Sequence, residues 1–268
     1  MTKLALIGAG TMGSAMLERW LASGILSSAE VVIVEKDPDR RDAVSGKLGV
    51  KAVESLKGIE EAKMYVLAVK PQDSGPVLEE LSGVVGEATV MTIMAGVPIS
   101  RLRKSLGENP SIVRVMPNVA ATVGAAASGY ALDPGPDGID EIMIVELLSA
   151  VGIPARVAES LIDAVTAVSG SGPAYFFFLV EALAEAGMKV GLTKEVARSL
   201  ARQTMWGAAS LLEHSGKEPE DLRKLVTSKG GTTAAALEVL ESSGIREIMD
   251  RAIEAARDRA RELSKEAD

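Results

Sequence analysis

Residues 4–13 read Leu-Ala-Leu-Ile-Gly-Ala-Gly-Thr-Met-Gly, an apolar run that leads directly into a Gly-x-Gly-x-x-Gly pattern. An apolar run this short, ending at glycine, is typical of a buried strand. The residues from Thr11 to about Ala22 then carry apolar side chains at helical spacing. The stretch therefore predicts a strand, a tight turn and a helix, the unit from which parallel α/β sheets are built.

The three glycines of this turn have separate physical tasks. Gly8 permits the tight turn, Gly10 lets the backbone approach a pyrophosphate, and Gly13 allows the helix to pack closely on the strand. The helix begins at Thr11 and Met12, and unpaired amide groups at a helix start suit a phosphate. Because the pattern follows a predicted strand and opens a predicted helix, it indicates a dinucleotide-binding site.

An acidic residue, Glu35, follows the second predicted strand, Val31–Val34. A carboxylate at this place hydrogen-bonds the ribose diol of NADH, and it would repel the 2′-phosphate of NADPH. Basic side chains lie close behind, at Lys36, Arg40 and Arg41, and they can bind that phosphate instead. The residues thus favour NADH and leave NADPH as the alternative.

Short apolar runs alternate with helix-length polar stretches as far as residue 116, which predicts a Rossmann-type, doubly wound parallel sheet. The later predicted strands are Met64–Val69, Val90–Met94 and Ile112–Met116. Such sheets bind ligands beyond the carboxyl ends of their strands. The loops at those ends are Lys70-Pro71, Ala95-Gly96 and Pro117-Asn118. The proline- and glycine-rich segment Asp133–Gly138 predicts a surface loop.

After about residue 160 the strand-like runs give way to alanine-rich segments of helical spacing. They predict helices over 173–190, 193–214, 218–226, 233–243 and 245–266. We therefore predict a Rossmann domain at 1–158, followed by an all-α dimerisation domain at 159–268. The run Tyr175–Phe178 places aromatic rings on several faces of one helix, which indicates burial on more than one side, as at a subunit interface.

The composition argues against several kinds of chemistry. The 268 residues carry a net charge of −8, which disfavours nucleic acid and anionic membranes as partners. The chain has no cysteine and a single histidine, His214, so we expect no disulfide, no thiolate or Ser-His-Asp catalysis, and no metal site. No run approaches the roughly 20 apolar residues that span a bilayer. Leu4–Ile7 is too short for a signal peptide, so we expect a cytoplasmic protein.

Two glycine-rich turns interrupt the helical half. In Ser169–Tyr175 the glycines precede Pro173, which is well suited to start a helix. Thr227–Thr233 reads Thr-Ser-Lys-Gly-Gly-Thr-Thr and offers hydroxyl and amide donors to a small ligand. Neither turn contains a strong acid, base or nucleophile. This suits hydride transfer to an activated C=N bond, which needs positioning and one weak proton donor.

These motifs resemble the pyrroline-5-carboxylate reductase family over essentially the whole chain. The segments that carry the similarity are Gly8–Gly13, Ala68–Gln72, Met94–Val97, Arg114–Asn118, Asp163–Tyr175 and Asp221–Leu240. The resemblance implies reduction of the cyclic imine 1-pyrroline-5-carboxylate to L-proline, the last step of proline biosynthesis. It further implies NADPH or NADH as the donor, a homodimer formed through the helical domain, and assembly as far as decamers in several members.

The resemblance also assigns roles to residues. Thr233 matches the threonine whose hydroxyl lies beside the imine nitrogen, and we expect it mainly to orient and polarise that bond. Ser228 and the amides of Gly231, Thr232 and Thr233 match the groups that hold the substrate carboxylate, while Asn118 would lie near the reacting ring. The expected cofactor contacts are Gly8, Gly10, Thr11, Met12, Gly13, Glu35, Lys36, Ala68, Val69, Lys70, Pro71, Ala95 and Gly96, with the nicotinamide along the last two.

The chain departs from the family pattern at three positions. Lys229 stands where members commonly carry proline, Val119 where many carry threonine, and Glu35 where NADPH-preferring members carry neutral or basic residues.

An alternative function is that of a β-hydroxyacid dehydrogenase of the same plan. Such an enzyme needs a catalytic lysine on the first long helix after the cofactor domain, where only Lys189, near its end, is available. A non-catalytic NAD(H)-binding regulator is a further alternative, but it has no need of the two donor-rich turns.

Overall fold

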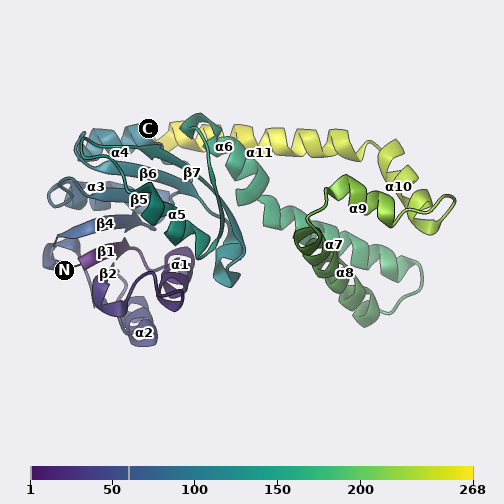
Figure 1. The fold of residues 1–268 in the computed structure, drawn as a ribbon, viewed down its shortest axis with the longest axis horizontal. Coiled ribbons are helices and arrows are strands. Elements are labelled where there is room, and N and C mark those ends of the chain that lie inside the picture. The colour runs from purple at the N-terminus through teal and green to yellow at the C-terminus, as the bar shows by residue number, and fades with distance from the viewer. Residues whose placement is uncertain (1, 60, 268) are drawn as a thin grey trace. The chain divides into compact units, whose positions relative to one another are not determined.

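The computed structural model describes residues 2–59 and 61–267 (Figure 1). By its internal contacts the chain divides into a first unit, Met1–Ser171 with Ala255–Asp268, and a second unit, Gly172–Glu254. This division differs from the predicted boundary after residue 158, because the helical turns over 159–170 pack against the sheet. The boundary between the functional domains stays a prediction.

One sheet runs through the first unit in the order β3-β2-β1-β4-β5-β6-β7-β8. Neighbouring strands are parallel except for β6 and β7, which are antiparallel. The strands are β1 Thr2–Ile7, β2 Val31–Val34, β3 Lys51–Val53, β4 Ala62–Leu67, β5 Thr89–Thr92, β6 Ser111–Met116, β7 Ala126–Asp133 and β8 Gly152–Arg156. The order reverses at β1, which confirms the doubly wound arrangement and places a ligand crevice beyond the carboxyl ends of β1 and β4.

Strands β3, β7 and β8 are missing from the sequence-based prediction. Strand β7 reads Ala-Ala-Ser-Gly-Tyr-Ala-Leu-Asp, which is poor in β-branched residues, and β8 contains Pro154. The small residues of β7 permit close packing, since a Cβ on Gly129 would stand 2.6 Å from the Val165 side chain. Pro154 is tolerated because β8 is an edge strand. Packing, rather than local propensity, therefore makes these segments strands.

Helices cover both faces of the sheet (Figure 1). Helices α1 and α5 supply the core on one face, and α3 and α4 supply it on the other. Trp20 of α1 is fully buried and donates its indole N–H to the Leu147 carbonyl of α5 at 2.8 Å. The helices of this unit include α1 Thr11–Ala22, α2 Pro38–Leu48, α3 Ser74–Ser82, α4 Ile99–Leu106, α5 Glu141–Ser149 and α6 Ile162–Val165. Shorter turns are η1 Ser28–Glu30, η2 Leu56–Gly58, η3 Pro71–Asp73, η4 Val119–Val123, η5 Glu159–Leu161 and the π-helical η6 Thr166–Gly170.

The second unit is helical, as predicted. Its helices are α7 Gly172–Lys189, α8 Lys194–Ser215, α9 Pro219–Leu225 and α10 Thr232–Ser242, and α11 Ile245–Ala267 begins in it and ends in the first unit. Local signals fix their ends. The Thr193 hydroxyl caps α8 by accepting from the Val196 N–H, and Gly216 ends that helix in the left-handed conformation.

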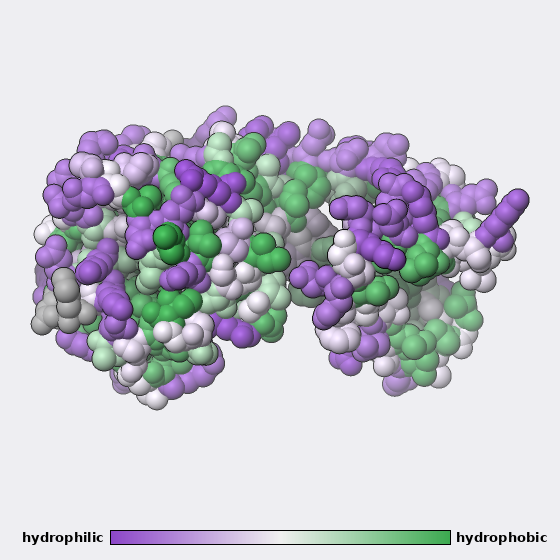
Figure 2. All heavy atoms as spheres, viewed as in Figure 1, coloured by the Kyte–Doolittle hydropathy of each residue, from purple (hydrophilic) through white to green (hydrophobic). Residues whose placement is uncertain are grey.

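The second unit buries little apolar surface within one copy of the chain. Among its described residues, only small ones are buried: Gly172, Ala184, Ala197 and Ala201. Large apolar side chains of α7 are exposed instead, namely Phe176, Phe177, Phe178, Leu179 and Leu183. Figure 2 shows apolar residues gathered on the viewed face of this unit. A surface of this kind marks a site of protein association.

Candidate functional site

A cavity of about 480 Å³ lies at the carboxyl ends of β1, β2 and β4. Its lining includes these predicted cofactor residues: Gly8, Gly10, Glu35, Lys36, Ala68, Val69 and Lys70. The other predicted cofactor residues lie outside the lining: Thr11, Met12, Gly13, Pro71, Ala95 and Gly96. The crevice is thus where the strand order requires it, and we call it the cofactor cleft.

The glycine turn shows why side chains are excluded from it. Gly8 has a φ of +93°, and a Cβ there would stand 2.9 Å from the Ala68 carbonyl carbon. A Cβ on Gly13 would overlap the Gly8 carbonyl oxygen, whereas a Cβ on Gly10 would have no heavy atom within 4 Å. Gly10 therefore faces the open space that an approaching pyrophosphate needs. Helix α1, which follows, has no side-chain cap, so its first amides are available to an anion.

Glu35 is tied to the glycine turn itself. Its side chain is 4% exposed, and Oε2 accepts from the Ala9 N–H at 2.9 Å. Oε1 accepts from the Asp37 N–H at 3.0 Å, while the Arg40 guanidinium donates to Oε2 at 3.3 Å. The sequence predicted a carboxylate that faces the ribose. In the structure this carboxylate fixes the turn to the end of β2, and its contact with the ribose stays a prediction.

The lining of the cofactor cleft carries more acidic than basic side chains. The acidic residues in its lining are Glu35, Asp37, Glu54, Asp73 and Glu80, and the basic ones are Lys36, Lys70 and Arg40. The Arg40 N–H donates to Asp37, which lowers the pKa of that carboxyl, and the Arg40 and Arg41 charges add to the effect. Asp37 therefore stays ionised at neutral pH. An additional anionic group therefore meets an unfavourable local charge in this cleft.

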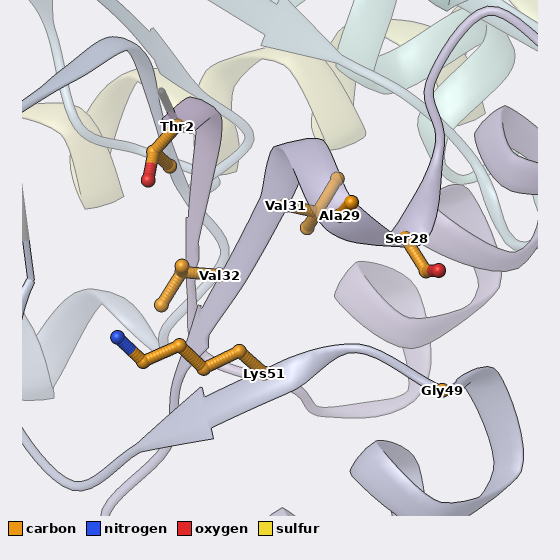
Figure 3. Close-up of a pocket in the computed structure, with 7 residues that line it drawn as sticks. All are labelled: Thr2, Ser28, Ala29, Val31, Val32, Gly49 and Lys51. Atoms are coloured by element: carbon orange, nitrogen blue, oxygen red, sulfur yellow. The ribbon is translucent and has the colours of Figure 1, made fainter.

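A second cavity, of about 400 Å³, lies at the opposite, amino ends of β1, β2 and β3. Figure 3 shows its lining, in which Lys51 is the charged side chain among Thr2, Ser28, Ala29, Val31, Val32 and Gly49. No predicted site residue lies there. One exposed lysine does not make a ligand site, and we assign this cavity no function.

Asn118 and the pair Ala95-Gly96 lie at the carboxyl ends of β6 and β5. Gly96 has a φ of +73°, which favours glycine. Asn118 is buried, and its amide is used twice: Nδ2 donates to the Ser169 carbonyl at 2.9 Å and Oδ1 accepts from the Ala120 N–H at 3.1 Å. Asn118 therefore joins η4 to η6, and its predicted contact with substrate stays a prediction.

Four of the five predicted substrate residues lie in one turn of the second unit, namely Ser228, Gly231, Thr232 and Thr233, whereas Asn118 lies in the first unit. Helix α10 begins at Thr232 after Gly231, with no side-chain cap. Gly230 has a φ of +71°, and the Gly231 N–H donates to the Ser228 carbonyl at 3.0 Å. The first amides of α10 and the Ser228 and Thr233 side chains thus lie at one helix start, which suits an anionic group. We call Ser228–Thr233 the donor turn.

Comparison with known proteins decides the family. A protein of Methanosarcina acetivorans named pyrroline-5-carboxylate reductase is 40% identical over 268 residues, and the alignment covers 98% of each chain. The chain belongs to the pyrroline-5-carboxylate reductase family. A relative of the same name from Mycobacterium tuberculosis is also 40% identical, over 98% of this chain and 97% of its own.

Family models and solved structures agree with this membership. The model described as pyrroline-5-carboxylate reductase dimerisation matches residues 159–263, and the one described as NADP oxidoreductase coenzyme F420-dependent matches 3–96. The structure of a pyrroline-5-carboxylate reductase from Coxiella burnetii has a TM-score of 0.92 at 36% identity and covers 98% of both chains. A Plasmodium falciparum pyrroline carboxylate reductase with NADP bound has a TM-score of 0.83 at 27% identity, also with 98% of both chains covered.

Family membership accounts for the exposed apolar helices. The second unit lies within the dimerisation match, so the apolar surface of α7 belongs to a region that associates with another subunit. The successive helical turns over Glu159–Lys189 span 31 residues, and their most apolar part has a mean hydropathy of 1.3. By length and composition this stretch could cross a membrane, which the sequence did not lead us to expect. Helices at subunit interfaces have the same composition, and this one lies in the dimerisation region.

Sequence reasoning missed the groups that support the site. Arg40 was noted only as a possible phosphate ligand, yet it pairs with Glu35 at 3.3 Å and with Asp37 at 3.5 Å. Arg114 was noted only within a motif, yet its side chain is 6% exposed and pairs with Glu159 at 3.0 Å. A charged residue inside an apolar strand was the available signal for Arg114. No sequence pattern indicated that Glu159, 45 residues away, would be its partner.

Proposed function

We propose that the chain reduces the C=N bond of 1-pyrroline-5-carboxylate to give L-proline, the last step of proline biosynthesis. A reduced nicotinamide supplies the hydride to the imine carbon, and a proton reaches the nitrogen. The observation that carries the proposal is the near full-length similarity to reductases of this name, with both the cofactor cleft and the donor turn present.

At the cofactor end, we propose that the pyrophosphate lies over the glycine turn and the start of α1. Gly10 offers open space and the α1 amides offer donors, which supports this position. The riboses and phosphates would then run along the loop after β4. The residues of this proposal are Gly8, Gly10, Thr11, Met12, Gly13, Ala68, Val69, Lys70 and Pro71, with the nicotinamide along Ala95 and Gly96.

We propose further that NADH is used at least as well as NADPH. Glu35 is buried and fixed by two backbone N–H groups, so it cannot move away from a 2′-phosphate. The other carboxylates of the cleft lining oppose that phosphate as well. Arg40 and Lys36 are the cations that would accept it, and Arg40 is already paired with Glu35.

At the substrate end, we propose that the donor turn holds the carboxylate through Ser228 and the amides of Gly231, Thr232 and Thr233. The positive end of the α10 dipole supports binding of an anion there. The Thr233 hydroxyl would polarise the imine nitrogen, while water completes the proton transfer, because an aliphatic hydroxyl is a weak acid. Asn118 would lie near the reacting ring.

We also propose a homodimer formed through the helical domain, with dimers assembling further to a decamer, and action in the cytoplasm. A β-hydroxyacid dehydrogenase is less well supported, because Lys189 is exposed at the last residue of α7. A non-catalytic regulator would leave the donor turn without a purpose.

The test is an assay of the purified protein with 1-pyrroline-5-carboxylate and either NADH or NADPH. We expect nicotinamide absorbance to fall and L-proline to accumulate in equal amount, with kcat/KM for NADH no lower than for NADPH. No oxidation with either donor would reject the reductase function. A large preference for NADPH would reject only the proposed role of Glu35.

A further inference from the structure

The loop that joins β5 to α4 is fixed at its start and constrained in its middle. The Thr92 hydroxyl accepts from the Met94 N–H at 3.2 Å. Gly96 has a φ of +73°, so the chain turns there in a way that other residues rarely allow. Ala95, between them, is exposed. In the proposed function, this exposed backbone supports the nicotinamide.

The other end of the loop is held by a group distant in sequence. Helix α4 has no side-chain cap, because its N-cap is Pro98, and it has no acidic residue in its first turn. The Ile99 N–H donates instead to Glu159 Oε1 at 2.7 Å, across 60 residues of sequence. The carboxylate also faces the positive end of the α4 dipole. Glu159 therefore fixes the point where the loop becomes helix.

Arg114 in turn holds Glu159. Its guanidinium is 6% exposed and donates to Glu159 Oε1 at 3.0 Å. Its Nη2 lies 3.8 Å from Asp163 Oδ1. Strand β6 pairs with β5 so that Arg114 stands opposite Thr92, at the start of the same loop. Because a buried cation without a carboxylate partner is costly, the positions of these groups depend on one another.

The end of α11 completes the arrangement. The Ser264 hydroxyl donates to Asp163 Oδ1 at 3.4 Å. The Leu263 backbone lies 3.4 Å from the place where a Cβ on Gly96 would stand. The end of this helix is therefore bonded to the acid beside Arg114 and packed against the middle of the loop. We call Arg114, Glu159, Asp163 and Ser264 the loop clasp.

We propose that the loop clasp positions the β5–α4 loop for the nicotinamide, so that Arg114 and Glu159 are positioning residues for hydride transfer. This inference rests on the proposed function, because it needs the ring to lie at Ala95 and Gly96. Loss of the clasp lets the loop shift, and a misplacement of about 1 Å can cost about a hundredfold in rate. In the part of the chain that the structure describes, no residue lining the cofactor cleft is hydrogen-bonded to the clasp or paired with it, so we expect the adenosine and pyrophosphate end to keep its arrangement.

The experiment compares Glu159→Ala with Glu159→Gln in the full-length protein. Calorimetry measures Kd for NADH and for ADP-ribose, which lacks the nicotinamide, and the assay measures kcat and KM for the imine. We expect Glu159→Ala to weaken NADH binding about tenfold and to lower kcat by about ten- to a hundredfold, with Kd for ADP-ribose within about twofold of the wild type. Glu159→Gln keeps an oxygen that can accept the Ile99 and Arg114 N–H groups, and Asp163 remains as the carboxylate beside Arg114, so this variant should recover most of both losses.

Glu262→Ala is the matched control, since Glu262 is exposed on α11 and pairs with Arg259 rather than with the clasp. This variant should have the Kd values for NADH and ADP-ribose, the kcat and the KM of the wild type. Equal losses for NADH and ADP-ribose, or none in Glu159→Ala, would overturn the proposal. If Glu159→Ala does not fold, the Kd values for NADH and ADP-ribose are compared in Asp163→Asn and Ser264→Ala instead. Wild-type protein that binds NADH but does not reduce the imine would reject the function, while the binding comparison would still test the clasp.

Discussion

The cofactor turn and the donor turn have a similar sequence character and different structural support. The cofactor turn, Gly8–Gly13, packs Gly8 and Gly13 against backbone atoms of its own unit and is tied by Ala9 to the buried Glu35. In the donor turn, a Cβ on Gly231 would meet chiefly the movable Ser228 hydroxyl, and the turn is largely exposed in a single chain. One chain therefore preorganises the cofactor turn, whereas it leaves the donor turn largely exposed.

The largest effect is expected within the cofactor turn, from Gly8→Ala compared with Gly10→Ala. Gly8→Ala meets both an unfavourable φ of +93° and the Ala68 backbone, so it should lower the free energy of unfolding by about 3 kcal/mol. Gly10→Ala points into open space and should unfold like the wild type, but bind NADH about tenfold more weakly. Thermal unfolding and calorimetry measure the two effects. Equal stability of both variants would contradict the packing argument.

Substitutions in the donor turn should change catalysis rather than the free energy of unfolding. Thr233→Ala removes the hydroxyl proposed to face the imine, so kcat/KM for the imine should fall by about ten- to a hundredfold, with Kd for NADH unchanged. Thr227→Ala is the control, because the Thr227 hydroxyl donates to the Arg223 carbonyl at 2.6 Å. Steady-state kinetics of both variants measure the difference. Equal losses in both would remove Thr233 from the mechanism.

A smaller effect is expected at the link between Glu35 and the cofactor turn. Glu35→Gln retains an oxygen for the Ala9 N–H and removes the charge, so the ratio of kcat/KM for NADPH to that for NADH should rise about tenfold. Glu54→Gln, at another acidic position of the cleft lining, should change the ratio much less. An unchanged ratio in Glu35→Gln would mean that the carboxylate serves only to hold the turn.

The smallest effect is expected at the amino ends of the strands, away from both turns. The Glu30 pKa is lowered from 4.5 to about 2, first by the Lys3 hydrogen bond and then by the Ser27 N–H and hydroxyl. Because the folded-state pKa is lowered, the stabilisation is present above about pH 4.5 and is lost as the pH falls towards 2. Lys3→Met should raise the Glu30 pKa, as measured by NMR titration, without changing Kd for NADH. A pKa that remains near 2 would assign the effect to Ser27.

The sequence by itself determined the parts of this protein that depend on local pattern. Leu4–Gly13 predicted the strand, turn and helix of the cofactor cleft, and the alanine-rich spacing after residue 160 predicted the helices of the second unit. Glycine, proline and capping residues act within a few residues of themselves, so their effect can be read along the chain. The proposed roles of Ser228 and Thr233 came from resemblance to a family and await their tests.

Only the tertiary structure decided the contacts between distant residues. Strand β7 forms although its residues have low strand propensity, because it pairs with β6 and β8 and packs on Val165. The Glu35 carboxylate meets the Ala9 N–H across 26 residues, and Glu159 caps α4 across 60. The partner of a buried charge or backbone group depends on which residues the fold places beside it, and no local sequence pattern predicts that partner.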